Sequence, residues 1–526
     1  MKATLLRALG FGVAGLAQAV AIAAPWNGQP QWWLQLLSLA GLVALLDGLR
    51  REGAGWRRAG LWGWLFSTTW LTGTFWWLFI SMHTYGGLPA PLAAVAVLAL
   101  AAGLGLYYAA ACAAFVVFAP ASRARAALFF LALWLLAELL RNSWFTGFPW
   151  GAGGYAHVDG PLAGYASWLG VYGVGAVASA IAAAAGLAWR APRHAQAWSG
   201  SVVAVLLAAP LGLALLHDDG GDANARGRLG VALLQGNIPQ DEKFIPGSGI
   251  ATALRWYGEQ LAAPKASLTI TPETAIPLLP SQLPAGYLQG IAGRYSVGEQ
   301  AAIVGLPLRN AATRGSLSEV IGATYSNAVL GFAPGQSTPY RYDKHHLVPF
   351  GEFIPTGFRW FIDMMNIPLG DFARGALPQP RFDWQGQRIA PNICYEDLFG
   401  DEIGAAFRDA ATAPTILLNV SNIAWFGDSI AIDQHLAISR MRALEFQRPM
   451  RCHGSDRPSW TRHAAVAAPH ARRAGGRGGG PRGNHALRLV GVARGLVAAV
   501  GTGAAGHGSG HLRHTTVTPL RSSGLL

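Results

Sequence analysis

Seven apolar stretches occupy most of the first 217 residues and limit what this part of the chain can form. A helix that crosses the ~30 Å hydrocarbon core of a bilayer needs about 20 predominantly apolar residues. The stretches cover residues 5–24, 32–46, 61–82, 92–118, 126–140, 162–189 and 198–216. The second and fifth have only 15 residues each, so flanking residues must extend them or the bilayer must thin. We predict a helical membrane domain over residues 1–217 with about seven transmembrane helices.

The positions of arginine predict how these helices are oriented. Positive residues stay on the cytoplasmic side, and they occur before the first stretch and in alternate loops after it, at 50–58, 123–125 and 190–193. The loops 25–31 and 83–89 have none. This pattern places the amino terminus in the cytoplasm and everything after residue 217 outside, which in a Gram-negative cell means an inner-membrane protein with a periplasmic domain. A signal peptide competes for the first stretch, but a second stretch follows almost at once.

Glu138 is an acid well inside the fifth stretch and has two interpretations. Acids inside a membrane are functional candidates by default. Arg141 lies one helical turn away, so an interfacial ion pair near the outer face is the alternative. The sequence leaves both open.

From residue 227 the sequence changes to short β-rich segments between polar turns. Apolar segments at 228–238, 266–276, 300–309, 325–335, 387–397 and 413–427 are typical of strands, and those at 249–263 and 433–447 are typical of helices. Segments such as "TILLNV" are apolar nearly throughout, which indicates sheets covered on both faces. We predict a layered α/β domain over residues 227–450.

Three polar residues follow such strands, where layered α/β folds place ligands: Glu273, Lys344 and Cys394. A carboxylate can take the proton of a thiol, and an ammonium can stabilise the oxyanion that forms when the thiolate attacks a carbonyl. Together they suit acyl transfer through a thioester. Singly, each has a plainer interpretation, as a turn, a solvated face and a small core residue respectively.

We expect no metal and no cofactor. His345 and His346 lack a third ligand at a suitable spacing. The three cysteines, at 112, 394 and 452, are too far apart in sequence for a CxxC metal site and too few for a disulfide framework.

The contexts "TPETAIP", "YDKHHLVPFGEFIP" and "NICYEDLFG" resemble the nitrilase or carbon-nitrogen hydrolase superfamily. With "WFGDS" and "QHLAISRMRALEFQRPM", they are similar to its membrane branch, the apolipoprotein N-acyltransferases, over roughly residues 1–450. The resemblance implies an αββα sandwich outside the membrane. It also implies transfer of a fatty acyl chain from a phospholipid donor to the terminal amine of a diacylglyceryl apolipoprotein.

The resemblance also implies the role of each site residue. Glu273 would be the general base, Lys344 the oxyanion-stabilising residue and Cys394 the nucleophile. The supporting residues would be Glu352, which positions the lysine and the cysteine, and Tyr395 and Glu396, which shape the pocket. Two departures stand out: Phe244 replaces a usual tryptophan, and Ile423 replaces a usual aspartate beside the active-site loop, which predicts a less ordered loop.

Residues 451–526 do not continue this pattern. They hold 11 Arg, no Lys and one Asp, which gives +10 of the total net charge of +13, so the basic charge belongs to a tail and does not indicate nucleic-acid binding. The resemblance implies further strands and a last membrane helix here. We interpret the Gly-, Arg- and His-rich tail as an aberrant frameshift product; a basic, disordered extension is the alternative.

Three other functions compete with lipid transfer. A membrane-bound nitrilase-type amidase would use the same three residues and pass the acyl group to water. A transporter with a soluble appendage predicts paired charges inside the membrane, and Glu138 alone supports that weakly. A chain made inactive by its altered carboxyl-terminal region is the third.

Overall fold

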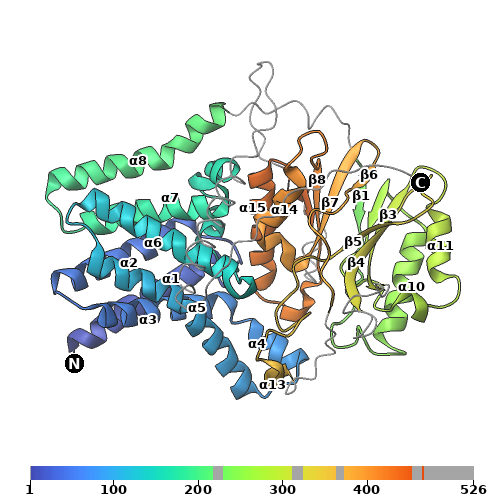
Figure 1. Cartoon of the computed structure of the whole chain (residues 1–526), viewed down its shortest axis with the longest axis horizontal. Coiled ribbons are helices and arrows are strands. Elements are labelled where there is room, and N and C mark those ends of the chain that lie inside the picture. Colours follow the sequence, from blue (N-terminus) through green and yellow to red (C-terminus); the bar gives the residue numbers. More distant parts are fainter. Residues whose placement is uncertain (1, 217–228, 311–323, 363–371, 453–464, 467–526) are drawn as a thin grey trace, which may run out of the picture.

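A computed structural model describes residues 2–216, 229–310, 324–362, 372–452 and 465–466. It has two halves that lie side by side, a bundle of long helices and an α/β sandwich (Figure 1). Most of the predicted tail, residues 453–464 and 467–526, lies outside the described residues.

Long helices form at every predicted apolar stretch. Their bounds are α1 (Lys2–Ile22), α2 (Trp32–Arg51), α3 (Trp56–Phe75), α5 (Ala90–Phe118), α6 (Arg123–Ser143), α7 (Ala166–Ala188) and α8 (Arg193–Leu216), with a short α4 (Leu78–Ile80) between α3 and α5. Flanking polar residues extend both short stretches, which is one of the two outcomes that the sequence left open. In α2 the extension is stabilised where Arg51 Nη2 meets Asp47 Oδ2 at 2.5 Å, one turn apart.

Four of the described helical segments are long and apolar enough to cross a membrane. They are Lys2–Ile22, Trp32–Arg51, Ala90–Phe118 and Pro161–Ala188. The chain is therefore a membrane protein. The count of seven spans and the orientation stay predictions.

Two five-stranded sheets form the other half. The first has the order β1 (Val231–Leu233), β2 (Leu268–Ile270), β3 (Ala301–Arg309), β4 (Tyr325–Phe332) and β5 (Tyr340–Asp343). The second has the order β10 (Ala465–Val466), β9 (Met450–Cys452), β8 (Ile416–Val420), β7 (Gln387–Ile393) and β6 (Phe382–Trp384). β1 to β3 are parallel, as are β7 to β9, and the remaining pairs are antiparallel.

The two sheets pack face to face, with helices on both outer faces. Ile270 and Val329 of the first sheet share a buried cluster with Ile393 and Val420 of the second. Figure 1 shows α10 (Gly249–Ala262) and α11 (Tyr287–Arg294) outside the first sheet, and α14 (Gly400–Gly404) and α15 (Ala431–Phe446) outside the second. The αββα sandwich predicted from the resemblance is confirmed.

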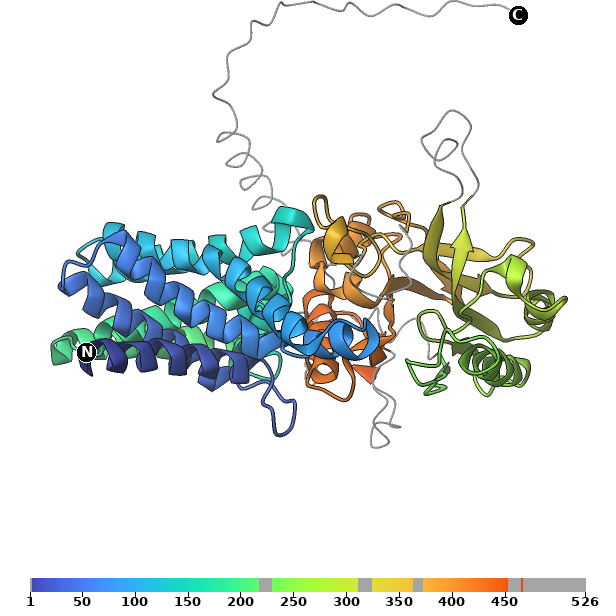
Figure 2. The same ribbon diagram turned by 90° about the horizontal axis from the view of Figure 1, so that it is seen from below.

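α15 lies between the second sheet and the membrane helices and joins the two halves (Figures 1 and 2). One continuous cluster of buried apolar side chains runs from α1 through the bundle to α15, and it includes Trp70, Trp150, Tyr395, Phe399 and Ile438. Polar residues of α15 are buried as well, so they must find partners on one side or the other. These partners connect the candidate site to the membrane helices.

Strands β9 and β10 continue the second sheet past residue 450. Cys452 is buried and pairs in parallel with Asn419 of β8. The predicted boundaries at 217, 227 and 450 stay predictions.

Candidate active site

The three residues singled out from the sequence follow strands of both sheets. Glu273 comes three residues after β2, Lys344 directly after β5 and Cys394 directly after β7. Lys344 Nζ lies 3.2 Å from Glu273 Oε1, and the charges of both act on the Cys394 thiol. The glutamate and the lysine come from the first sheet and the cysteine from the second. Face-to-face packing of the sheets thus brings the three together.

Lys344 is a buried ammonium held between two carboxylates. Its Nζ lies 3.0 Å from Glu352 Oε1 and 2.9 Å from Glu352 Oε2, in addition to the contact with Glu273. Asn327 of β4 donates from Nδ2 to Glu273 Oε1 and to Glu352 Oε1, both at 2.7 Å. The amide therefore fixes the spacing of the two carboxylates around the lysine.

The protein interior stabilises the charged forms of Glu273 and Lys344. Burial raises the pKa of Glu273, but the Lys344 ammonium and hydrogen bonds from Asn327 and from the backbone N–H of Asn422 outweigh burial, so the pKa is lowered. Burial lowers the pKa of Lys344, but Glu273 and Glu352 outweigh it, so that pKa is raised. At neutral pH the glutamate is an anion and the lysine a cation.

Cys394 is the cysteine with partial exposure, whereas Cys112 and Cys452 are buried. Burial and the negative charge of Glu273 raise the pKa of the Cys394 thiol well above its usual range, against the effect of Lys344. The resting residue is therefore a neutral thiol beside an ionised carboxylate. This is the starting arrangement for general-base activation of a nucleophile.

Glu396 links two segments by hydrogen bonds. One is the lysine loop, which follows Lys344, and the other is the cysteine loop, the turn at Cys394–Leu398. Its Oε1 accepts from the backbone N–H groups of His345 (2.6 Å) and His346 (3.2 Å). Its Oε2 accepts from the backbone N–H of Ile393 (2.6 Å) and the hydroxyl of Tyr342 (2.9 Å). Burial raises the pKa of Glu396 to about 7 in spite of these donors.

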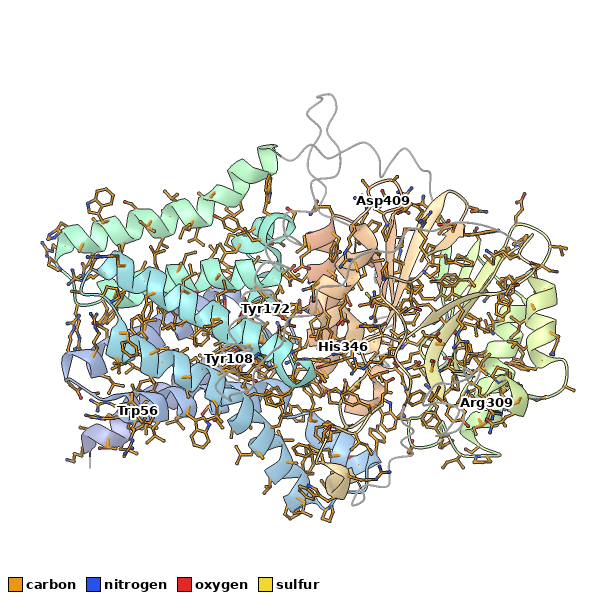
Figure 3. All side chains as sticks on the ribbon, in the orientation of Figure 1. Trp56, Tyr108, Tyr172, Arg309, His346 and Asp409 are labelled. Atoms are coloured by element: carbon orange, nitrogen blue, oxygen red, sulfur yellow. The ribbon has the colours of Figure 1, made fainter. Side chains whose placement is uncertain are left out.

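Tyr395 connects the cysteine loop to the helical half. Its hydroxyl donates to the carbonyl oxygen of Gly147 at 3.1 Å, and its ring lies 6.3 Å from that of Phe148. In Figure 3, Tyr172 of the bundle and His346 of the sandwich lie near the boundary of the two halves, while Trp56 and Arg309 lie far from it. The site is thus next to the membrane helices.

Glu138 and Arg141 are both buried, and among the described residues no salt bridge within 4.0 Å joins them. Arg141 donates instead to the Tyr108 hydroxyl and to the carbonyl oxygens of Phe148 and Trp150. Glu138 Oε1 accepts from the backbone N–H of Gly153 at 2.8 Å. The interfacial ion pair is therefore wrong: Glu138 accepts from the N–H of Gly153, and Arg141 donates to Tyr108 and to two loop carbonyls.

The structure shows the contacts of the two residues that depart from the family pattern and of the two neighbouring histidines. Phe244 stacks on Trp425 with ring centroids 6.3 Å apart, so an aromatic contact is kept. Ile423 is buried in the apolar cluster. His345 Nδ1 donates to the carbonyl oxygen of Gly375 (2.6 Å), and His346 Nδ1 lies 3.0 Å from Glu402 Oε1.

Sequence reasoning missed Asn327, Asn419 and His435. A buried asparagine inside the apolar strand "YSNAVLGF" was the available signal for Asn327. Asn419, inside "TILLNV", gave the same signal. His435 stands in a helical pattern, and nothing local distinguishes it from a surface histidine.

Two family models match separate parts of the chain. The model of the apolipoprotein N-acyltransferase N-terminal domain matches residues 14–184, and that of carbon-nitrogen hydrolase matches residues 230–488. An apolipoprotein N-acyltransferase from Verminephrobacter eiseniae is 56% identical over 446 residues, which cover 83% of this chain and 81% of that protein. The chain belongs to the apolipoprotein N-acyltransferase family. A second relative with that name, from Ralstonia nicotianae, is 47% identical over 80% of this chain and 77% of its own length.

Membership of the apolipoprotein N-acyltransferase family makes the chain an acyltransferase of lipoprotein maturation, and its carbon-nitrogen hydrolase domain fits acyl transfer through a cysteine. Among solved structures, a variant of the Nesterenkonia AN1 amidase from the nitrilase superfamily is 19% identical, with a TM-score of 0.28, over 43% of this chain and 75% of its own. The amidase alternative is not favoured, because the acyltransferase relatives match both halves of the chain.

Proposed function

We propose that Cys394 carries the acyl chain as a thioester, with Glu273 as general base and Lys344 as the oxyanion-stabilising residue. The donor is a phospholipid, and the acceptor is the amine of an amino-terminal diacylglyceryl cysteine on a lipoprotein. The observation that carries the proposal is the Lys344–Glu273 contact of 3.2 Å beside the Cys394 thiol. A neutral thiol, an ionised base and a fixed cation are the groups that acyl transfer needs.

In the first half-reaction Glu273 takes the proton of the Cys394 thiol as sulfur attacks the ester carbonyl of the phospholipid. The carbonyl oxygen becomes an oxyanion, which the Lys344 ammonium stabilises in a site shielded from water. The intermediate collapses when the ester C–O bond breaks. The leaving alkoxide takes the proton from Glu273, and the lysophospholipid departs.

In the second half-reaction the α-amine of the lipoprotein attacks the thioester. Glu273 takes a proton from the attacking amine and returns it to the Cys394 sulfur as the C–S bond breaks. The products are an amide and the original thiol. Because the acyl chain stays on Cys394 as a thioester after the lysophospholipid has left, the kinetics are of the ping-pong type.

Glu352, Tyr395 and Glu396 support this chemistry. Glu352 positions Lys344 through its two short contacts. Glu396 holds the backbone just after Lys344 and just before Cys394, and Tyr395 fixes the cysteine loop to the Gly147 loop.

We place the protein in the inner membrane with the sandwich in the periplasm, on the arginine pattern of the loops. Both lipid substrates are then anchored in the leaflet next to the site, and the helices exclude water that would hydrolyse the thioester.

The test replaces Cys394 with Ser and with Ala in the full chain. Membranes receive a phospholipid with a labelled acyl chain, and mass spectrometry follows the label to Cys394, to a lipoprotein amine or to free fatty acid. The proposal expects labelled Cys394 and labelled amine in the parent and neither in Cys394→Ala. Undiminished amine labelling in Cys394→Ala contradicts the proposed nucleophile, and label found only as free fatty acid supports the amidase.

We further propose that residues 451–526 are a frameshift product that weakens activity. The composition of this segment supports the proposal. It is rich in Arg, Gly, Ala, Pro and His, as is the sequence that results when GC-rich DNA is translated in the wrong reading frame. Resequencing the gene and mass spectrometry of the carboxyl-terminal peptides test it. An unbroken frame together with the tail peptides would contradict it.

A further inference from the structure

Cys394 has a backbone conformation that side chains rarely adopt. Its φ is +53°, in the left-handed region, where the Cβ atom crowds the following carbonyl. Such a residue keeps its conformation only when its surroundings hold it there. The groups that hold Cys394 therefore decide where the thiol lies.

Two side chains hold the carbonyl oxygen of Cys394. Asn419 Nδ2, from β8, donates to it at 3.0 Å. His435 Nε2, from α15, lies 3.3 Å from it, and because a carbonyl only accepts, that nitrogen carries the proton. The same Nε2 lies 3.5 Å from Asp397 Oδ1, three residues beyond the cysteine. His435 thus contacts the cysteine loop at two points.

Gln434, the neighbour of His435, is held by the membrane half. Its Oε1 accepts from the indole N–H groups of Trp77 (3.0 Å) and Trp150 (2.7 Å). Its Nε2 donates to the carbonyl oxygen of Thr74 at 2.8 Å. All three partners are residues of the helical half or its loops, and Gln434 is buried, so these bonds fix the position of α15.

We propose that His435 is a positioning residue for the nucleophile, and that Gln434 makes this positioning depend on the docking of α15 against the membrane half. The inference rests on the proposed role of Cys394. It assigns the helical half a second role besides membrane anchoring: its two tryptophans and one backbone carbonyl set the conformation of a residue in the sandwich. Cys394 is then poised for reaction only when the two halves are docked.

The test uses the full chain with His435→Ala, His435→Gln and Gln434→Ala. Glutamine keeps a donor that reaches a carbonyl, whereas alanine does not. The matched control is Arg440→Gln. It removes an ion pair between Arg440 of α15 and Asp159 of the helical half, and neither of these residues contacts the cysteine loop. For each protein, mass spectrometry measures the rate of Cys394 acylation by labelled phospholipid at several donor concentrations, and the rate of Cys394 alkylation by iodoacetamide.

We expect both alanine variants to lower the maximal acylation rate by about 10- to 100-fold, because small displacements of a reacting atom have effects of this size. The donor concentration at half-maximal rate should change by less than about twofold, since neither residue is placed at the lipid. His435→Gln should recover most of the rate, and Arg440→Gln should match the parent. Alkylation of Cys394 should slow in the same two alanine variants.

Alanine variants that react within about twofold of the parent overturn the inference, as does a His435→Gln variant as slow as His435→Ala. A parent that is alkylated at Cys394 but never acylated contradicts the proposed function instead. In that case the alkylation rates alone decide the inference, since equal rates in parent and alanine variants overturn it.

Discussion

Lys344 meets both carboxylate oxygens of Glu352, at 3.0 and 2.9 Å from its Nζ, while the same Nζ lies 3.2 Å from Glu273. Removing the cation leaves two buried carboxylates that lose their shared counter-charge, while Asn327 still donates to both. We therefore expect Lys344→Met to lower the free energy of unfolding by about 3–5 kcal/mol and to abolish acyl transfer. Denaturant titration in detergent and the label assay measure the two effects.

The matched control is the double variant Lys344→Met with Glu352→Gln. It removes one of the two orphaned charges, so part of the lost stability should return. Acyl transfer should stay absent, because the oxyanion still lacks its cation. Recovery of activity in the double variant would contradict the role of Lys344.

Glu273→Gln should separate thiol ionisation from catalysis. The negative charge of Glu273 helps to raise the pKa of Cys394, after the larger effect of burial. Its removal should move the half-rise of the iodoacetamide alkylation rate to lower pH, while acyl transfer falls by about 100-fold or more because the proton acceptor is gone. A rate profile that moves to higher pH would show that Glu273 stabilises the thiolate.

Glu396 should make stability depend on pH. Its pKa is about 7 in the folded protein, against 4.5 for a free carboxyl, so the folded state binds the proton more tightly. The free energy of unfolding should therefore fall as pH rises from about 4.5 to about 7, by about 3 kcal/mol from this group. Denaturant titrations across this range measure the slope, and Glu396→Gln should flatten it. An equal slope in both proteins contradicts the assignment.

Glu445 of α15 should matter more than the exposed ion pair beside it. Its Oε1 accepts from the backbone N–H of Val171 (2.6 Å), at the break in α7 where Gly170 has φ +68°, and its Oε2 lies 2.9 Å from Arg442. Glu445→Ala removes the carboxylate partner of the buried Arg442 guanidinium and the acceptor of a buried N–H, so we expect a loss of about 3–5 kcal/mol. Arg440→Gln should cost less than about 1 kcal/mol, because its pair with Asp159 is partly exposed. Thermal melting compares the two variants, and equal losses would contradict this ranking.

The layered fold could be predicted because its signals are local. Apolar runs before Glu273 and Cys394 mark strands β2 and β7, and recognising them needs no knowledge of the other strands. Strand β5 before Lys344 has the sequence YRYD, which is not an apolar run, and it was not among the predicted strands. The residues that make hydrogen bonds between distant parts of the chain could not be predicted in this way. Asn327 stabilises two carboxylates that lie 54 and 25 residues away in sequence. Gln434 reaches Trp77 across 357 residues. Such contacts follow from how sheets and helices pack, which local periodicity does not encode.

Helix ends show the same limit. The apolar stretch ended at residue 46, just before Asp47, yet α2 continues through Arg50 and Arg51, because Asp47 on the same face pairs with Arg51. The Glu138–Arg141 ion pair failed for a related reason. The loop carbonyls of Phe148 and Trp150 accept from Arg141, and the sequence gives no sign that they fold back onto α6.

The apolar cluster that runs from α1 to α15 without interruption bears on how the protein is assembled. A sandwich expressed without its helices would present Tyr395, Phe399 and Ile438 to water, and an uncovered face of this kind favours aggregation. Both halves should therefore melt in one cooperative transition. Insertion into the bilayer then does more than locate the enzyme, because it is also a step in its folding.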